Sequence, residues 1–199
     1  MNDTMVLTES AQDLLFREAR TANTFTDEPI GDDIVNAIYE LVKWAPTSYN
    51  QQPLRVVLVR SPEARARLVH EMIDGNKQKT TAAPLTAILA ADNDFHRNIP
   101  TQFPVFPNAK DILFGDPDRR EIEASLNATL QVAYFILGIR AAGLAAGPMS
   151  GFDADAVAKE FFPDGRHRAL VVINIGRPGP QAWYPRLPRL DYDQVFSTV

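Results

Sequence analysis

Short apolar runs alternate along the chain with segments of helical periodicity. Runs at 56–59, 84–91 and 169–175 predict strands that are buried on both faces, because a half-exposed strand alternates polar and apolar residues. A fourth short strand is expected within 144–151, where it runs into a glycine-flanked turn. Strands separated by helices indicate an α/β or α+β layered domain with helices on both faces of the sheet.

Apolar residues that recur every three or four positions predict the helices, which we place at 10–22, about 32–45, 61–73, 118–142 and 153–162. The helix at 118–142 is apolar on most sides, which indicates burial in the core or at an oligomer interface. Gly143 is its expected C-cap.

Residues 76–80 are interpreted as a polar linker. The long segment 92–116 has no clear period, and its phenylalanines suggest either a lid over an apolar site, loop packing or a subunit contact.

Composition narrows the class of protein. The 199 residues, 45% of them apolar, suit one globular domain spanning 1–199. The net charge of −5 argues against nucleic acid as a partner. The absence of cysteine excludes thiolate metal sites, and three scattered histidines give no metal-ligand spacing. We found no apolar run of membrane-spanning length and no signal pattern, so a cytoplasmic protein without a membrane partner is expected.

Five polar segments stand out, at 20–23, 46–53, 76–79, 147–151 and 186–189. Pro46 and Pro53 bracket the second one, and proline stiffens a loop by fixing its own φ. Together the segments offer guanidinium, ammonium, hydroxyl, amide and backbone N–H groups, but no credible nucleophile and no paired carboxylates. Such a set suits a phosphate-bearing cofactor that carries the chemistry itself. The alternative is that these are ordinary surface loops.

At these segments the sequence resembles the nitroreductase family of FMN-dependent NAD(P)H oxidoreductases. The family pattern P-S-S-x-N-x-Q-P corresponds to PTSYNQQP at 46–53, with Thr47 in place of one serine. Asn76 and Lys79 meet the pattern N-x-x-K, and residues 147–151 approximate A-P-x-E-G. Within the family the chain is most similar to the branch that holds malonic semialdehyde reductase, through Ala19-Arg20-Thr21 with Asn23, Gly75-Asn76 with Gln78-Lys79-Thr80, and Leu187-Pro188-Arg189-Leu190.

The resemblance implies an α+β sandwich with a central mixed sheet and helices on both faces, assembled as an intertwined homodimer with FMN at the subunit interface. It also implies the residues that bind the cofactor: Arg20, Thr21 and Asn23 along the flavin, Asn76 and Lys79 at its pyrimidine end, Pro148, Met149, Ser150 and Gly151 beside N5, Arg186 and Arg189 at the phosphate, and Pro46, Thr47, Ser48 and Asn50 from the partner. Lys79, Ser150 and Gly151 are the expected catalytic positions.

The implied reaction is a ping-pong hydride transfer from NADH or NADPH through FMN to a small substrate such as malonic semialdehyde, giving 3-hydroxypropanoate. The nicotinamide would bind only transiently, because the chain has no G-x-G-x-x-G fingerprint. Asn23 stands where many relatives carry lysine, and Ser150 where they carry glutamate. The alternatives are a nitro- or quinone reductase, a flavin-binding module without a committed substrate, and a dimerisation domain without cofactor.

Overall fold

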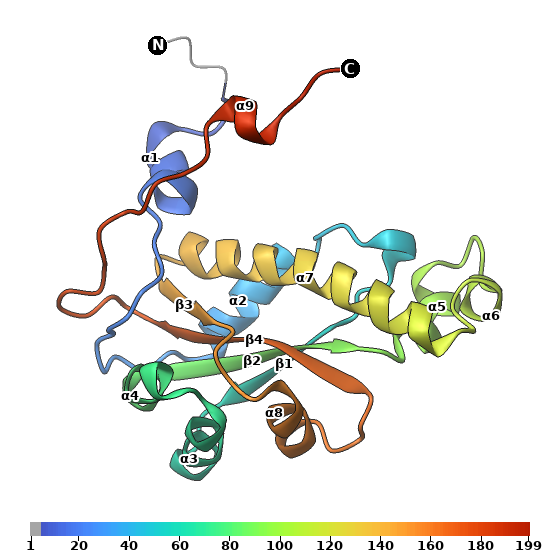
Figure 1. The fold of residues 1–199 in the computed structure, drawn as a ribbon, viewed down its shortest axis with the longest axis horizontal. Helices are drawn as coiled ribbons and strands as arrows, with labels where there is room; N and C mark the ends of the chain where they lie inside the picture. Colours follow the sequence, from blue (N-terminus) through green and yellow to red (C-terminus); the bar gives the residue numbers. More distant parts are fainter. Residues whose placement is uncertain (1–4) are drawn as a thin grey trace.

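Residues 5–199, which the computed structural model describes, form a four-stranded antiparallel sheet in the order β1-β2-β4-β3 (Figure 1). Its strands are β1 (Leu54–Val59), β2 (Leu85–Asp92), β3 (Ala145–Met149) and β4 (His167–Gly176). The expectation of a mixed sheet is therefore wrong for the described part of the chain. The expectation that the first strand is buried on both faces is also wrong, since β1 lies at an edge of the sheet. The sequence did not reveal this, because a short apolar run looks the same in an edge strand as in a central one.

The central strand β2 is buried throughout, as the sequence predicted, and β4 is buried from Val172 to Gly176 but only in part before that. Successive side chains of β2 point to opposite faces, so Leu85, Ala87 and Leu89 pack in one core cluster while Ile88 and Ala90 pack in another. Each face of the sheet thus needs a helical layer to cover it.

Helices cover both faces, which confirms the predicted sandwich (Figure 1). One layer consists of α2 (Asp32–Val42) and α7 (Pro117–Ala141), and the other of α3 (Pro62–Glu71), α4 (Asp74–Ala82) and α8 (Ala154–Phe161). Gly138 lets α7 approach α2 closely, since a Cβ there would lie 2.4 Å from Val42 Cγ1. Gly143 ends α7 with φ of 72°, as predicted.

The long helix α7 is buried on the side that faces the sheet and is apolar over much of its length. Val132, Phe135 and Ile139 are buried against the sheet. Its most apolar 18 residues have a mean hydropathy of 1.3, so by length and composition α7 could also span a membrane, contrary to our reading of the sequence. Its packing across the sheet is that of a core helix.

The first predicted helix stops earlier than expected. It consists of α1 (Glu9–Gln12) and a single π-helical turn, η1 (Asp13–Arg17), and does not reach residue 22. Beyond Glu18 the backbone forms hydrogen bonds with β3 and the tail instead of with itself, as when Ala22 N donates to Ala146 O. Tertiary hydrogen bonds here override a weak local periodicity.

Two other segments are more ordered than predicted. The expected linker at 76–80 is part of α4, whose Asn76 and Thr80 are buried. The segment 92–116 contains three short helices, and its Phe95 and Phe114 lie in a core cluster and do not cover a site. The three short helices of this segment are η3 (Phe95–Asn98), α5 (Ile99–Gln102) and α6 (Ala109–Ile112). Elsewhere the short helices are η2 (Ser48–Asn50) and α9 (Tyr192–Val195).

The chain ends in an arm that makes little contact with its own domain. From Trp183 to Val199 every side chain is exposed, including Leu187 and Phe196 at 74% and 60%. The arm and the N-terminal helices rise from the same side of the sandwich (Figure 1).

Candidate functional site

Residues 19–24 run without helix or strand along the edge of the sheet formed by β3. Ala22 N donates to Ala146 O at 3.0 Å, and Asn23 N donates to Ala182 O at 3.0 Å. The approach is so close that a Cβ on Gly147 would lie 2.6 Å from Ala22 O. The N-terminal segment, β3 and the start of the tail are therefore fastened together at one edge of the sheet.

Five of the predicted cofactor residues line one cavity between this segment and the tail. The cavity has a volume of about 250 Å³, and the five are Arg20, Thr21, Asn23, Arg186 and Arg189. Segments more than 160 positions apart in the sequence thus meet where the motifs predicted a common site.

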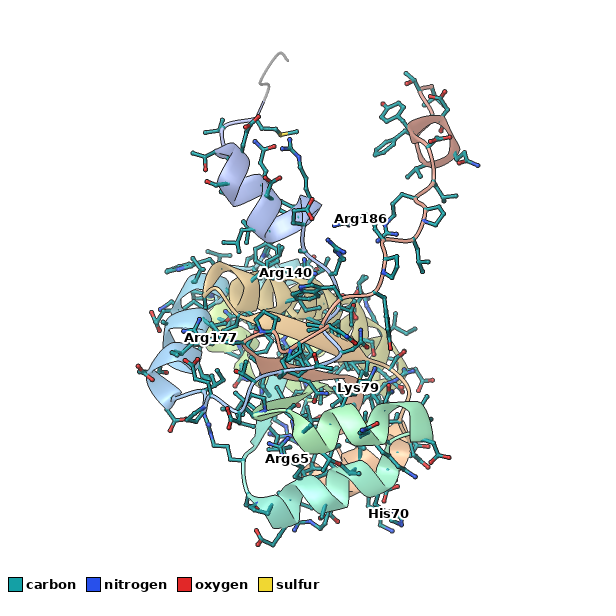
Figure 2. The ribbon with its side chains drawn as sticks, turned by 90° about the vertical axis from the view of Figure 1, so that its left-hand side faces the viewer. Arg65, His70, Lys79, Arg140, Arg177 and Arg186 are labelled. Carbon is teal, nitrogen blue, oxygen red and sulfur yellow. The ribbon has the colours of Figure 1, made fainter. Side chains whose placement is uncertain are left out.

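The guanidinium groups of this cavity are incompletely neutralised. Arg20 pairs with Glu18 at 3.2 Å, but its Nε is buried without a hydrogen-bond partner. Arg186 donates to the carbonyl of Arg17, and Figure 2 shows it between the arm and the N-terminal helices. Arg189 donates to two carbonyls of its own loop at 2.9 and 3.0 Å. Among residues 5–199 no carboxylate pairs with Arg186 or Arg189, so the cavity suits an anion such as a phosphate.

A second group of predicted residues meets where α4 begins and β3 ends. Gly151 O accepts hydrogen bonds from Asn76 Nδ2 at 2.9 Å and from Ile73 N at 3.1 Å. Lys79 lies three positions after Asn76, on the same side of α4. The structure thus brings Asn76, Lys79 and the turn at 148–151 together, although α4 was expected to be a linker.

Lys79 is a half-buried cation without a counter-ion. Within the described chain no carboxylate lies within ion-pair distance of its Nζ, and burial lowers the pKa of Lys79. Figure 2 shows Lys79 on the side of α4 that faces away from α3. A positive charge kept partly out of water with no protein partner is a typical feature of a ligand site.

A buried polar network lies beneath this turn, and sequence reasoning gave none of its members a role except Met149. Asn174 and Thr80 both contact the Met149 sulfur at 3.9 Å, and Thr86 Oγ1 donates to Asn174 Oδ1 at 2.9 Å. Arg65 donates to Thr80 O at 2.8 Å, and burial lowers the pKa of Arg65. The available signal was Asn174, a lone amide within the apolar run ALVVINI.

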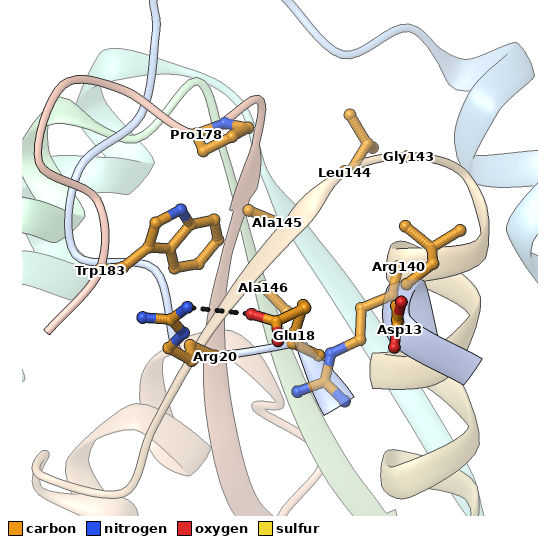
Figure 3. Close-up of a pocket in the computed structure, with 12 residues that line it drawn as sticks. Asp13, Glu18, Arg20, Arg140, Gly143, Leu144, Ala145, Ala146, Pro178 and Trp183 are labelled. Carbon is orange, nitrogen blue, oxygen red and sulfur yellow. Dashed lines mark hydrogen bonds and ion pairs between the residues drawn. The ribbon is translucent and has the colours of Figure 1, made fainter. Parts of the chain in front are cut away.

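A neighbouring hollow of about 200 Å³ shares Arg20 with the arginine-lined cavity (Figure 3). Trp183 and Arg140 stand on its sides, and Ala145 and Ala146 form part of its lining. Arg140 donates to Leu15 O at 3.0 Å, and burial lowers its pKa. Sequence reasoning missed Arg140 and Trp183, because one resembles an ordinary helix-terminal cation and the other lies in a tail without periodicity.

The loop at 46–53 stands apart from these groups within one chain. Pro46, Thr47 and Asn50 line a separate hollow of about 340 Å³, with Tyr39 and Trp44. The loop lies against α7, near α5, whereas β3 and α4 are at the other end of the sheet (Figure 1). The segments at 20–23 and 186–189 thus meet at one cavity and those at 76–79 and 147–151 meet where α4 begins, whereas the loop at 46–53 meets neither group.

A model of the nitroreductase family matches residues 16–177. The chain belongs to the nitroreductase family. A protein of Streptomyces coelicolor, provisionally named NADH dehydrogenase/NAD(P)H nitroreductase, is 65% identical over 98% of this chain and 99% of its own length. A protein of Streptomyces griseus with the same provisional name is 62% identical over the same shares.

Solved nitroreductase structures share the fold. A nitroreductase family protein of Streptococcus pneumoniae superposes with a TM-score of 0.81 at 23% identity, over 92% of this chain and 98% of that one. A provisionally named nitroreductase of Exiguobacterium sibiricum, solved in complex with FMN, gives 0.81 at 18% identity, over 98% and 99%.

The comparisons confirm the family and the predicted enzyme class, an NAD(P)H oxidoreductase. The names of the similar proteins agree with the nitroreductase alternative rather than with a malonic semialdehyde branch.

The residues present fit the flavin nucleotide of a nitroreductase. The orphaned Arg20 Nε and the uncompensated Arg186 and Arg189 suit a phosphate. Lys79, lacking a counter-ion, suits a ring edge that gains negative charge.

Proposed function

We propose that this nitroreductase is an FMN-dependent NAD(P)H oxidoreductase that acts as a homodimer, with FMN held between the two subunits. The observation that carries the proposal is the arginine-lined cavity, whose Arg186 and Arg189 have no carboxylate partner in the described chain. The edge of β3 joins it to the turn beside Lys79. A phosphate group and a polar ring need such a pair of adjoining sites.

Each segment has a separate task in this proposal. Arg186 and Arg189, with Arg20, would hold the phosphate, and Thr21 and Asn23 would line the cofactor between them and β3. Asn76 and Lys79 would meet the pyrimidine end of the ring, beside Pro148, Met149, Ser150 and Gly151. When bound, FMN supplies a ring that takes a hydride from NAD(P)H and gives it to the acceptor.

Lys79 and Ser150 are the side chains we assign to catalysis. Lys79 stabilises negative charge through its ammonium group, and its partial burial strengthens that effect because water screens it less. The Ser150 hydroxyl is exposed at the turn and is placed to donate a hydrogen bond to an acceptor. The backbone of Gly151 completes the turn.

Two features support a homodimer. Ile122, Leu126 and Leu130 form an exposed apolar stripe on α7, at 70%, 60% and 45% exposure. The C-terminal arm exposes large apolar side chains, among them Leu187, Leu190 and Phe196, and makes little contact with its own chain. A second copy would cover both, and would supply Pro46, Thr47, Ser48 and Asn50, which one chain leaves distant from its own arginine-lined cavity.

The acceptor is proposed at two levels. The provisional names of the Streptomyces relatives favour a nitro compound or a quinone. Malonic semialdehyde is the narrower candidate, and it rests on the resemblance of segments such as Leu187-Pro188-Arg189-Leu190 to that branch; Asn23 and Ser150, in place of the usual lysine and glutamate, are compatible with it. Turnover of a nitroaromatic, a quinone and malonic semialdehyde with NADH and with NADPH separates them. Reduction of the aldehyde alone would support the narrower reading.

The cofactor proposal is tested by titrating the apoprotein with FMN. Substituting Arg189→Gln removes a charge-assisted hydrogen bond, so FMN should bind roughly tenfold to a hundredfold more weakly. Arg177→Gln is the matched control, because Arg177 pairs with Glu28 at 2.7 Å outside the cavity. Equal affinity in the two variants would remove Arg189 from the site, and a wild-type protein that ignores FMN would refute the cofactor itself.

A further inference from the structure

The backbone of the loop at 46–53 is strained. Tyr49, Asn50 and Gln52 have positive φ values of 50°, 50° and 47°, and within residues 5–199 the only other non-glycine residue with positive φ is Gln181. Side chains with a Cβ rarely adopt this left-handed conformation, because it costs free energy. Three such residues in one short loop need surroundings that hold them in place.

Gln102 of α5 bonds two of the strained residues directly, Asn50 at 2.9 Å and Gln52 at 3.0 Å. The residues next to the strained ones are held by three polar side chains spaced four residues apart on α7. They accept hydrogen bonds from two residues of the loop and from the first residue of β1: Ser48 N to Asn127 Oδ1 at 2.7 Å, Gln51 Nε2 to Glu123 Oε2 at 3.3 Å, and Leu54 N to Gln131 Oε1 at 3.0 Å. A spacing of four places all three on one side of the helix. We call Glu123, Asn127 and Gln131 the α7 ladder.

Asn127 is the central and most buried member of the ladder, with 2% of its surface exposed. Its Nδ2 donates to Glu123 O at 2.9 Å, so its Oδ1 is fixed as the acceptor for Ser48 N. A side-chain amide whose nitrogen donates and whose oxygen accepts cannot rotate without losing a buried hydrogen bond. The loop therefore depends on a single fixed orientation of this side chain.

Packing alone does not explain the strain. Tyr49 makes edge-on contacts with Phe103 and Phe114, with ring centroids 5.4 and 5.7 Å apart, which accounts for one of the three residues. Ser48 and Asn50 remain exposed, so the ladder holds polar groups that face outward. Strain that presents exposed polar groups is typical of a ligand-binding loop.

We propose that the α7 ladder is a positioning element that holds loop 46–53 in the conformation that receives the FMN of the partner subunit. This inference rests on the proposed function. The ladder lies one residue beyond the exposed stripe of Ile122, Leu126 and Leu130 on the same helix. One rigid helix thus carries both the surface that meets a second copy and the groups that shape the loop.

The test compares full-length wild-type protein with Asn127→Ala, using hydrogen exchange of residues 47–52 and the dissociation constant for FMN. Loss of the acceptor for Ser48 N should speed exchange of the loop amides and weaken FMN binding about tenfold, because an unanchored loop must be ordered again on binding. Ser125→Ala is the matched control, since Ser125 Oγ is buried on α7 without a partner. It should change neither measurement.

Further variants guard against misfolding. Asn127→Asp keeps an oxygen for Ser48 N but loses the donor to Glu123, so an intermediate affinity is expected; Gln131→Ala should also weaken FMN binding while leaving the Asn127 contact intact. If exchange rises in these variants while FMN affinity stays at the wild-type value, the ladder serves the fold only and the proposal is overturned. Wild-type protein that does not bind FMN would overturn the proposed function and this inference together.

Discussion

Loop 46–53 and the turn at 148–151 both carry family motifs, but they are held by opposite means. The turn continues β3, whose Met149 pairs with Val172, and Gly151 O accepts a backbone and an amide hydrogen bond. The loop precedes β1 and is held by side chains of α7 and by Gln102 of α5. Positions beside the sheet should therefore tolerate no added volume, whereas the loop should tolerate glycine but not the loss of its anchors.

The largest effect is expected where the sheet leaves no room. Gly147→Val places methyl groups against Ala22 O, which lies 2.6 Å from the position of a Cβ, so we expect a loss of about 3 kcal/mol in the free energy of unfolding. Urea denaturation measures it. Gly75→Ala is the control, because a Cβ there meets nothing within 4 Å and alanine favours the helix. Equal stability of the two variants would contradict the comparison.

A large effect on rate, without one on stability, is expected beside the turn. Lys79→Met should slow reduction of bound FMN by NAD(P)H about tenfold to a hundredfold, because it removes a cation near the developing charge. The pKa of Lys79 is lowered by burial, so its charged form is less stable in the folded protein, and the variant should unfold no more easily. Stopped-flow absorbance measures the rate. Lys77→Met, which breaks only an exposed pair with Asp74, should leave it unchanged.

A small effect is expected in the strained loop. Gln52→Gly relieves a φ of 47° but loses side-chain hydrogen bonds to Asn50 and Gln102, so the free energy of unfolding should change by less than about 1 kcal/mol. Thermal and urea unfolding give the value. A loss as large as that of Gly147→Val would mean that the hydrogen bonds of Gln52 to Asn50 and Gln102, and not the side chains of α7, hold the loop.

The smallest effect concerns His96, in the segment that packs beside the loop. Burial, followed by the nearby Arg120, lowers the pKa of His96 below its usual value of 6.5, although Asp94 opposes this. The unfolded chain then binds the proton more tightly, so stability should fall as the pH drops through the range just below 6.5. His96→Asn should lessen that fall in urea titrations at pH 7 and pH 5. An identical pH dependence in both proteins would show that His96 does not cause the loss of stability at low pH.

The sequence predicted the parts of the fold that follow an apolar period. The strands, α2, α7 and α8 appear as expected, because their buried faces leave a pattern. Helix α4 left none, since DGNKQKTTA is polar and owes its order to Asn76 and Thr80, which contact Gly151 and Met149 from a distant part of the chain. The prediction of a first helix that reaches residue 22 failed for the same reason, because the backbone of Ala22 forms a hydrogen bond with Ala146 of β3.

The motifs of the candidate site could be recognised in the sequence, but the residues that support it left a signal only in part. The resemblance brought Arg20 together with Arg186 and Arg189, and Asn76 with Gly151, as the structure does. The ladder left a readable signal, since Asn127 is a polar residue with polar neighbours four positions away on a mostly apolar helix. Arg140 left none, because a cation at the end of a helix is ordinary.

If α7 carries both the exposed stripe and the ladder as proposed, the rotational position of its residues matters more than their composition. Adding one residue between Ile122 and Leu126 would rotate the two parts of the helix by about 100° relative to each other. Asn127 would then turn away from Ser48 at the same time as Leu126 left the exposed side. Homologous chains should accordingly vary in the side chains of this helix while keeping its length from Glu123 to Gln131 unaltered.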